Sequence, residues 1–268
     1  MPFFRDDEER PSARFLEHGY VIAPAEDRAA LDRIRDFVAD RTAAFLHLPA
    51  PVDRDAFLNG IAPHVGDPQR LNDLRLAVID ALLETPWFRE AYFACGRSVI
   101  ERIVGNELAM QRSIGFSIQL PGDRSSTLPL HSDAWSEDSP FEVVLWIPLV
   151  DVRATKSMFV LPRHRDDAWR SRMHDFAGRT VDEFYEALRD EVEFLDIPYG
   201  NVLLFTHTIM HGNLVNREPA ARWSMNVRFK SLFTPYSDKK LGDFFDPITL
   251  RAASRVGMHY RLPEGFDD

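Results

Sequence analysis

Two histidines and one aspartate have the donor atoms most suited to holding a metal ion. His131 and Asp133 lie two positions apart in the segment His131-Ser132-Asp133. In an extended segment, side chains two apart point the same way, so an imidazole and a carboxylate would converge on one point. Such short pairs also arise by chance, and taken alone this one is better explained by a surface loop with a hydrogen-bonded histidine.

A third donor comes from later in the chain. The apolar stretch 201–205 predicts a buried strand, and it leads to His207 and His211. With His211 added, the set becomes two nitrogens and one oxygen, the facial triad of non-haem iron(II) oxygenases. Zinc more often takes thiolates or three histidines, and the single cysteine, Cys95, excludes an all-thiolate site. His207 is a second candidate for this ligand, but we expect it to support the ligands from behind.

An arginine and a serine follow on a predicted strand. In the segment 222–233, polar residues alternate with apolar ones, which places Arg222, Ser224, Asn226 and Arg228 on one face. A guanidinium can bind a carboxylate through two parallel hydrogen bonds, and a neighbouring hydroxyl can add a third. Arg222 and Ser224 therefore suit the distal carboxylate of 2-oxoglutarate, whose keto-acid end would chelate the iron. A surface ion pair is the plainer interpretation of Arg222.

The elements that must position these residues change in character along the chain. Apolar residues recur at helical spacing within the first hundred residues, including 67–83 and 87–103, and these stripes predict helices that pack against a core. Short strand-like segments follow, with one helix expected at 180–190: 114–120, 141–150, 157–161, 192–197, 201–205 and 222–233. Short strands separated by proline and glycine favour a sandwich or small barrel over a parallel sheet.

Composition restricts the class of protein. The chain has 268 residues with 45% hydrophobic content, enough for one well-packed domain. The net charge of -10 argues against nucleic acid as a partner. We expect no membrane span, because no apolar run approaches the roughly 20 residues that a bilayer requires. The acidic start and the lone cysteine, which cannot form an intrachain disulfide, favour a cytoplasmic protein.

The order His-x-Asp, His, Arg-x-Ser resembles the phytanoyl-CoA dioxygenase superfamily of Fe(II)- and 2-oxoglutarate-dependent oxygenases. Within it, the chain looks most like the bacterial oxygenases found sporadically in surface-carbohydrate biosynthesis clusters. The resemblance covers nearly the whole chain. The stretches that carry it are FLEHGYVI (15–22), LHSDAW (130–135), SPFEVVLWIPLVDV (139–152), KSMFVLP (156–162) and GNVLLFTHTIMHGN (200–213).

This resemblance implies a mainly β fold with flanking helices, a cupin-like double-stranded β-helix or jelly roll. One oxygenase domain would span 1–268, with a helical buttress at 1–105, the jelly-roll core at 106–236 and a C-terminal helix or tail at 237–268. His131, Asp133 and His211 would bind Fe(II), and Arg222 and Ser224 would bind 2-oxoglutarate, with O2 as second co-substrate. Related halogenases lack the carboxylate, so Asp133 favours hydroxylation or another oxidation.

Several other polar residues are candidates for the pocket. We expect Gln119 beside the co-substrate, and the segment 121–129 is a candidate lid. Trp146 and Met158 are expected in the core. The candidates for contact with the substrate are Trp135, Lys156, Asn213, Arg228 and His207.

The substrate is expected to be a small polar molecule, such as a sugar, a nucleotide sugar or a surface-glycan precursor. Two other functions stay open: a cupin-like metal hydrolase or isomerase with the same three ligands, and a non-enzymatic jelly-roll module that binds carbohydrate. Because histidines bind metal only when neutral, we expect metal affinity to fall on acidification. The sequence makes no prediction of the oligomeric state.

Overall fold

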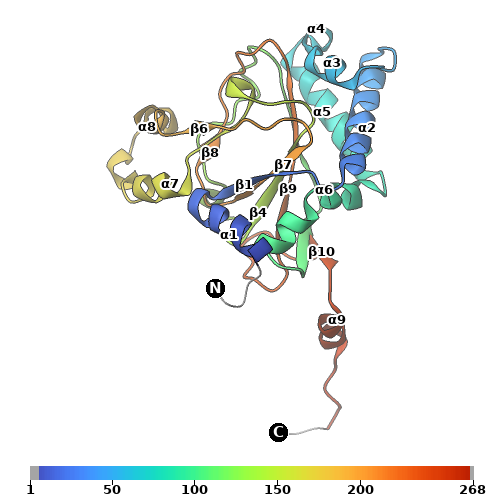
Figure 1. Ribbon diagram of the computed structural model, residues 1–268, viewed down its shortest axis with the longest axis vertical. Coiled ribbons are helices and arrows are strands. Elements are labelled where there is room, and N and C mark those ends of the chain that lie inside the picture. The colour runs from blue at the N-terminus through green and yellow to red at the C-terminus, as the bar shows by residue number, and fades with distance from the viewer. Residues whose placement is uncertain (1–5, 266–268) are drawn as a thin grey trace.

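The computed structural model describes residues 6–265, so the ends of the predicted domain and the first half of the acidic start lie outside the described residues. An antiparallel sheet forms the centre, with helices on two sides (Figure 1). A second, smaller sheet packs near it, which gives the predicted jelly-roll type of core with flanking helices. The fold class is thereby confirmed.

The large sheet has seven strands. Its order is β1 (Tyr20–Pro24), β7 (Asn201–Thr206), β4 (Val143–Pro148), β9 (Arg222–Ser231), β2 (Leu108–Gln111) and β10 (Phe245–Thr249), and β3 (Gly115–Gln119) also pairs with β9. The small sheet runs β6 (Glu193–Phe194), β5 (Phe159–Val160) and β8 (His211–Gly212). The two ligand-bearing segments of the chain therefore belong to the small sheet and its edge.

Most helices precede or interrupt the strands. The N-terminal group is α1 (Asp6–His18), α2 (Arg28–Leu46), α3 (Arg54–Asn59), α4 (Ala62–Val65), α5 (Pro68–Leu83) and α6 (Phe88–Ile103). Three of these begin at an aspartate, Asp27, Asp53 or Asp67, whose carboxylate accepts a hydrogen bond from a first-turn amide. α7 (Arg163–Arg170) and α8 (Val181–Leu188) lie on the opposite side of the molecule from α2 to α5, α1 packs against α6 and α7, and α9 (Ala252–His259) stands apart from the body (Figure 1).

The N-terminal helices cover one face of the large sheet and leave the other face to the site. The hydroxyl of Tyr92 in α6 donates to the carbonyl of Leu145 in β4 at 2.7 Å. A Cβ at Gly96 would lie 2.6 Å from a methyl carbon of Leu145, so only glycine allows α6 this close to β4. Trp223, one of the largest fully buried side chains, donates its indole N–H to the carbonyl of Leu58 at 2.7 Å. This packing fixes the backs of β4 and β9.

Two features of the sheet differ from the sequence prediction. β1 and β10 lie outside the range 106–236 expected for the core, and the expected C-terminal helix or tail contributes a strand as well as α9. β10 escaped detection because it is a short edge strand that contains Pro247, which an edge tolerates. None of the helices within residues 6–265 is long and apolar enough to cross a bilayer.

Candidate metal centre and co-substrate site

The two histidines predicted as metal ligands face each other across a pair of main-chain hydrogen bonds. The amide of His131 donates to the carbonyl of His211 at 2.9 Å, and the amide of His211 donates back at 2.8 Å. Residues paired in this way place their side chains on the same face. The two imidazole rings accordingly lie with their centroids 4.3 Å apart.

Asp133 is brought to the same point by the local backbone. Ser132 is extended, with φ -118° and ψ 134°, and a short 3-10 helix begins at Asp133 (Asp133–Ser136). The hydroxyl of Ser132 and the amide of Ala134 both donate to the carbonyl of His207, at 2.9 Å and 3.2 Å. One donor atom each from His131, Asp133 and His211 then lies within 4.8 Å of the other two.

Both imidazoles of the predicted ligands have Nδ1 hydrogen-bonded to the main chain. Nδ1 of His131 is 2.8 Å from the carbonyl oxygen of Pro129, and Nδ1 of His211 is 3.1 Å from that of Ile209. A carbonyl only accepts, so each Nδ1 donates its proton there and each Nε2 is the atom left for a metal; Nε2 of His131 lies 3.7 Å from Oδ1 of Asp133. The donor set fits Fe(II), because two imidazole nitrogens and one carboxylate converge on one point.

The protonation equilibria also favour a metal site. Burial, with the neighbouring His131 next in importance, lowers the pKa of His211 to about 4. Burial opposes charge on Asp133 as well, but His131, His211, His207 and Arg228 outweigh it and hold its pKa well below the ordinary value. At neutral pH the site therefore presents an ionised carboxylate and a neutral His211. Burial acts to lower the pKa of His131, but its contacts with Asp133 and Pro129 raise it overall.

Arg222 lines a cavity together with His131, Asp133 and His211, and no residue within 6–265 forms an ion pair with it. Its side chain is buried, and its one hydrogen bond is from Nη2 to the hydroxyl of Ser117 at 3.0 Å. Nε of Arg222 and Oγ of Ser224 are both buried without a hydrogen-bond partner. Burial, with a smaller contribution from Arg75, lowers the pKa of Arg222 to about 10. An unpaired buried guanidinium beside an unpaired hydroxyl is the arrangement expected of a carboxylate-binding site.

A cavity of about 440 Å³ joins the metal and arginine ends. It contains all three predicted metal ligands together with Arg222 and Ser224. Of the predicted substrate contacts, Asn213 and Arg228 line it. The amide oxygen of Asn213 already accepts from the amide of Leu128 at 2.8 Å.

Four predicted contacts do not line this cavity. Gln119 donates from Nε2 to the carbonyl of Leu214 at 2.6 Å, and Lys156 donates to the amide oxygen of Asn59 at 2.6 Å. Trp135 is 41% exposed and contributes to a separate groove beside α8. His207 is buried behind Asp133. Gln119 and Lys156 are each bonded to a residue more than 90 positions away in the chain, which a strand pattern cannot reveal.

Other lining residues were not predicted to face the cavity. Trp146 and Met158 lie in the core, as expected, and also line the cavity. Asn226 lies between Ser224 and Arg228 on β9, and its alternation with apolar neighbours was the available signal. Residues 125–128, within the predicted lid, also line the cavity. Arg75 contacts Ser126 and donates to the carbonyl of Ile118 at 2.6 Å, which ties this segment to α5.

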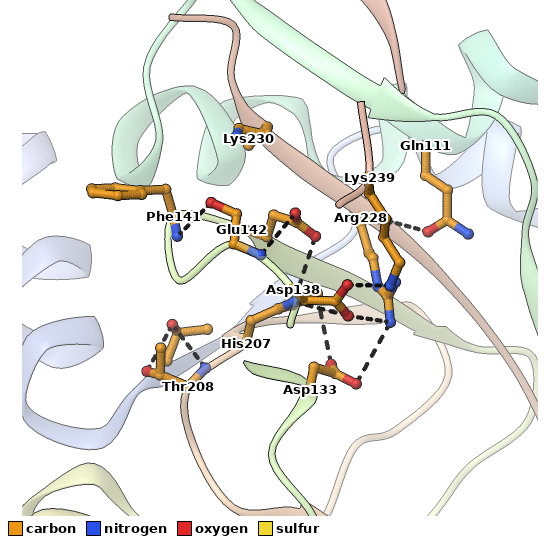
Figure 2. A network of polar contacts seen from close by, with 12 residues as sticks. Gln111, Asp133, Asp138, Phe141, Glu142, His207, Thr208, Arg228, Lys230 and Lys239 are labelled. Carbon is orange, nitrogen blue, oxygen red and sulfur yellow. Dashed lines mark hydrogen bonds and ion pairs between the residues drawn. The ribbon is translucent and has the colours of Figure 1, made fainter. Parts of the chain in front are cut away.

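A second group of side chains with metal-ligating atoms lies close to Asp133. Asp138, Glu142 and His207 are all buried, with donor atoms within 4.8 Å of one another (Figure 2). Burial lowers the pKa of His207 to about 3, so its ring is neutral. Burial, with Asp138 next, raises the pKa of Glu142 to about 7. Arg228 and Lys239 both contact Asp138, so two cations already lie against this group.

Comparisons with known proteins find likeness at the level of structure. No protein-family model matches the chain, and no curated protein matches its sequence. The solved structure of a non-heme monooxygenase, the ThoJ-Ni complex, aligns with a TM-score of 0.59 at 13% identity, over 96% of this chain and 90% of that one. The non-heme alpha ketoglutarate dependent carbocyclase SnoK aligns with a TM-score of 0.54 at 15% identity, over 92% and 98% of the two chains.

EctD from S. alaskensis, solved with 2-oxoglutarate and 5-hydroxyectoine, aligns with a TM-score of 0.53 at 16% identity. That alignment covers 85% of this chain and 77% of EctD. At these sequence identities the likeness supports the fold alone, and the chemistry has to be inferred from the site. The chain has the fold of these non-heme proteins, along nearly its whole length.

Proposed function

We propose that the protein is a non-haem Fe(II)- and 2-oxoglutarate-dependent oxygenase. The observation that carries the proposal is the buried guanidinium of Arg222, which shares one cavity with the His131, Asp133 and His211 donors and lacks an anion. A cupin-like hydrolase or isomerase needs the metal ligands but not Arg222, and a carbohydrate-binding module needs neither the metal ligands nor Arg222. An oxygenase that binds a dicarboxylate needs both ends of this cavity.

Each residue has a defined task in this proposal. Nε2 of His131, Nε2 of His211 and the carboxylate of Asp133 would hold the iron. Arg222 and Ser224 would bind the distal carboxylate through charge-assisted hydrogen bonds. The iron, when bound with 2-oxoglutarate and O2, supplies the oxidising power, and the co-substrate leaves as succinate and CO2.

The walls of the cavity control access to this chemistry. Val144, Phe205 and Met158 are buried apolar residues that line it, and they limit the water that reaches the ligands. Asp133 occupies the position that halogenases leave to halide, so we propose hydroxylation or another oxidation.

The substrate we propose is a small polar molecule, such as a sugar, a nucleotide sugar or a surface-glycan precursor. The size of the cavity supports this, because about 440 Å³ must hold both the co-substrate and the reacting part of the substrate. Serine, threonine and asparagine side chains line it, namely Ser117, Ser125, Ser126, Thr127, Asn213 and Asn226, and these suit hydroxyl groups. We also propose that the protein belongs to the carbohydrate-cluster subgroup of these oxygenases and that it is cytoplasmic.

The test is release of succinate from 2-oxoglutarate in air, with and without Fe(II). We expect iron-dependent succinate from the wild-type chain and none from His211→Ala or Arg222→Met. Candidate sugars and nucleotide sugars are then screened for stimulation of that rate. Metal-dependent turnover of a substrate that proceeds without 2-oxoglutarate would instead identify the hydrolase or isomerase.

A further inference from the structure

A network of charged and polar side chains contacts the carboxylate of Asp133. It consists of Asp138, Glu142, His207, Arg228 and Lys239 (Figure 2). The side chains of Asp138, Glu142 and His207 are 2%, 0% and 0% exposed, whereas those of the two cations are partly exposed. Oε2 of Glu142 and both ring nitrogens of His207 lack a hydrogen-bond partner, so the ion pairs of Asp138 with Arg228 and Lys239 are the main polar contacts of the network.

Two members of the network contact the carboxylate of Asp133, one at each oxygen. Nη2 of Arg228 lies 3.6 Å from Oδ1, and Nε2 of His207 lies 3.6 Å from Oδ2. The carbonyl of His207 also accepts the two hydrogen bonds from Ser132 and Ala134 that hold the backbone on either side of Asp133. The Oδ1 that Arg228 contacts also lies 3.7 Å from Nε2 of His131, so Arg228 and His131 share that oxygen.

Asp138 holds Arg228 in place from the other side. Its Oδ2 lies 3.2 Å from the same Nη2 of Arg228, and its Oδ1 contacts Nζ of Lys239. Arg228 therefore bridges two carboxylates, of which Asp138 is the more deeply buried. Apart from Asp133 itself, Asp138 is the only residue within 6–265 that forms an ion pair with this guanidinium.

A second metal ion in this network is disfavoured by the charges already present. The donor atoms of Asp138, Glu142 and His207 are close enough to hold one. An ion there would face the guanidinium and the ammonium that already neutralise Asp138. Like charges this close in a buried setting repel strongly. Arg228 and Lys239 supply the positive charge next to Asp138 that a second metal ion would otherwise supply.

We propose that Asp138 is a positioning residue for the metal ligand Asp133, acting through Arg228, and that the network binds no second metal. This inference rests on the proposed metal site of His131, Asp133 and His211. Supporting residues behind a metal ligand fix its orientation, and their loss weakens metal affinity by about 10- to 100-fold. Asp138 does not line the cavity, and its contact with Arg228 at 3.2 Å is closer than its contact with Nδ1 of His207 at 3.9 Å, so its effect on Asp133 is assigned to Arg228.

The test is a double-mutant cycle on metal affinity. Binding of Co(II), an air-stable probe of the iron site, is measured by calorimetry for Asp138→Asn, Arg228→Gln and the double variant. We expect each single variant to bind Co(II) at least about 10-fold more weakly, and the double variant to be no weaker than the worse single one. A changed Co(II) absorption spectrum is expected in both single variants, because the carboxylate of Asp133 is reoriented.

The matched control is Asp246→Asn. Asp246 also joins two cations, with Arg112 at 2.8 Å and Arg89 at 3.2 Å, but on β10, outside the cavity. We expect Co(II) affinity and spectrum to stay at wild-type values there. Thermal unfolding of each metal-free variant shows whether it is folded.

Arg228→Lys keeps the test decisive if Asp138→Asn does not fold. A lysine retains the charge but lacks the fork that bridges two carboxylates, so we expect affinity between those of wild type and Arg228→Gln. Equal affinities for the lysine and glutamine variants would overturn the inference. So would wild-type binding by Asp138→Asn, losses that multiply in the double variant, or a second Co(II) that Asp138→Asn removes.

Failure of the underlying metal site looks different. In that case wild-type protein would bind no Co(II), or His211→Ala would bind it as tightly as wild type.

Discussion

Replacing Arg222 with methionine is expected to have opposite effects on co-substrate binding and on the stability of the ligand-free protein. Burial lowers the pKa of Arg222 from 12.5 to about 10. Each pKa unit corresponds to about 1.4 kcal/mol, so holding this charge without an anion costs the fold on the order of 3 kcal/mol at neutral pH. The sign follows because a basic group whose pKa falls on folding destabilises the fold at every pH where it stays charged.

Methionine removes that cost and fills the space with an apolar chain. The loss of the hydrogen bond to Ser117 offsets about 1 kcal/mol. With a net gain of about 2 kcal/mol and about 2–4 °C per kcal/mol for a chain of this length, we expect the melting temperature to rise by roughly 5 °C. Binding of 2-oxoglutarate loses two charge-assisted hydrogen bonds of about 1.5–3 kcal/mol each, which corresponds to at least about 100-fold weaker affinity.

Both effects can be measured by thermal unfolding, with and without Co(II) and 2-oxoglutarate under nitrogen. The wild-type chain is expected to gain about 2.7 kcal/mol at a co-substrate concentration 100 times the Kd, and the variant is expected to gain at most about 0.4 kcal/mol. Ser117→Ala, which removes only the partner hydroxyl, serves as the control. An Arg222→Met protein that melts lower than wild type, or that gains as much stability from 2-oxoglutarate as wild type does, would refute the reasoning and make Arg222 a structural residue.

Other predictions concern the metal, the packing and the lid. Metal affinity is expected to fall as the pH drops below the raised pKa of His131. Because His211 gains its proton only near pH 4, about one proton should be released per metal bound down to pH 5. Calorimetry in a pH series measures this dependence, and an affinity that does not change with pH would contradict it. Gly96→Ala is expected to cost about 1–3 kcal/mol, seen as a lower urea midpoint, because its Cβ would meet Leu145, whereas Gly257→Ala has open space and serves as the control. Arg75→Met is expected to speed amide hydrogen exchange in residues 123–128, which it ties to α5; unchanged exchange would remove the support for a lid.

The parts of the fold that sequence could predict are those with a strong periodic pattern. The helix expected at 67–83 is α5, that at 87–103 is α6, and the strand at 222–233 is β9, each within two residues at either end. α7 was missed, and α1 was not located individually within the predicted helical buttress, because charged residues dominate both, with Pro11 inside α1. β5 and β6 lie within the strands predicted at 157–161 and 192–197, but only pairing defines their two-residue extent, and the equally short β8 was not predicted.

The site divides in a similar way. His131, Asp133, His211, Arg222 and Ser224 were predicted to share one site, and the structure brings them around one cavity. The substrate contacts could not be predicted equally well, because a polar residue in a strand has several ways to satisfy its hydrogen bonds. Lys156 pairs with Asn59, which lies 97 residues earlier in the chain. Such long-range partners leave no trace in the local pattern.

The paired main-chain hydrogen bonds between His131 and His211 have a consequence for assembly of the centre. Two of the three ligands are held in register by the backbone, so the entropy of bringing them together is lost during folding and not when the ion arrives. Stripping the ion with a chelator is then expected to leave the circular dichroism of the protein unchanged, and refolding is expected to proceed at the same rate with or without iron.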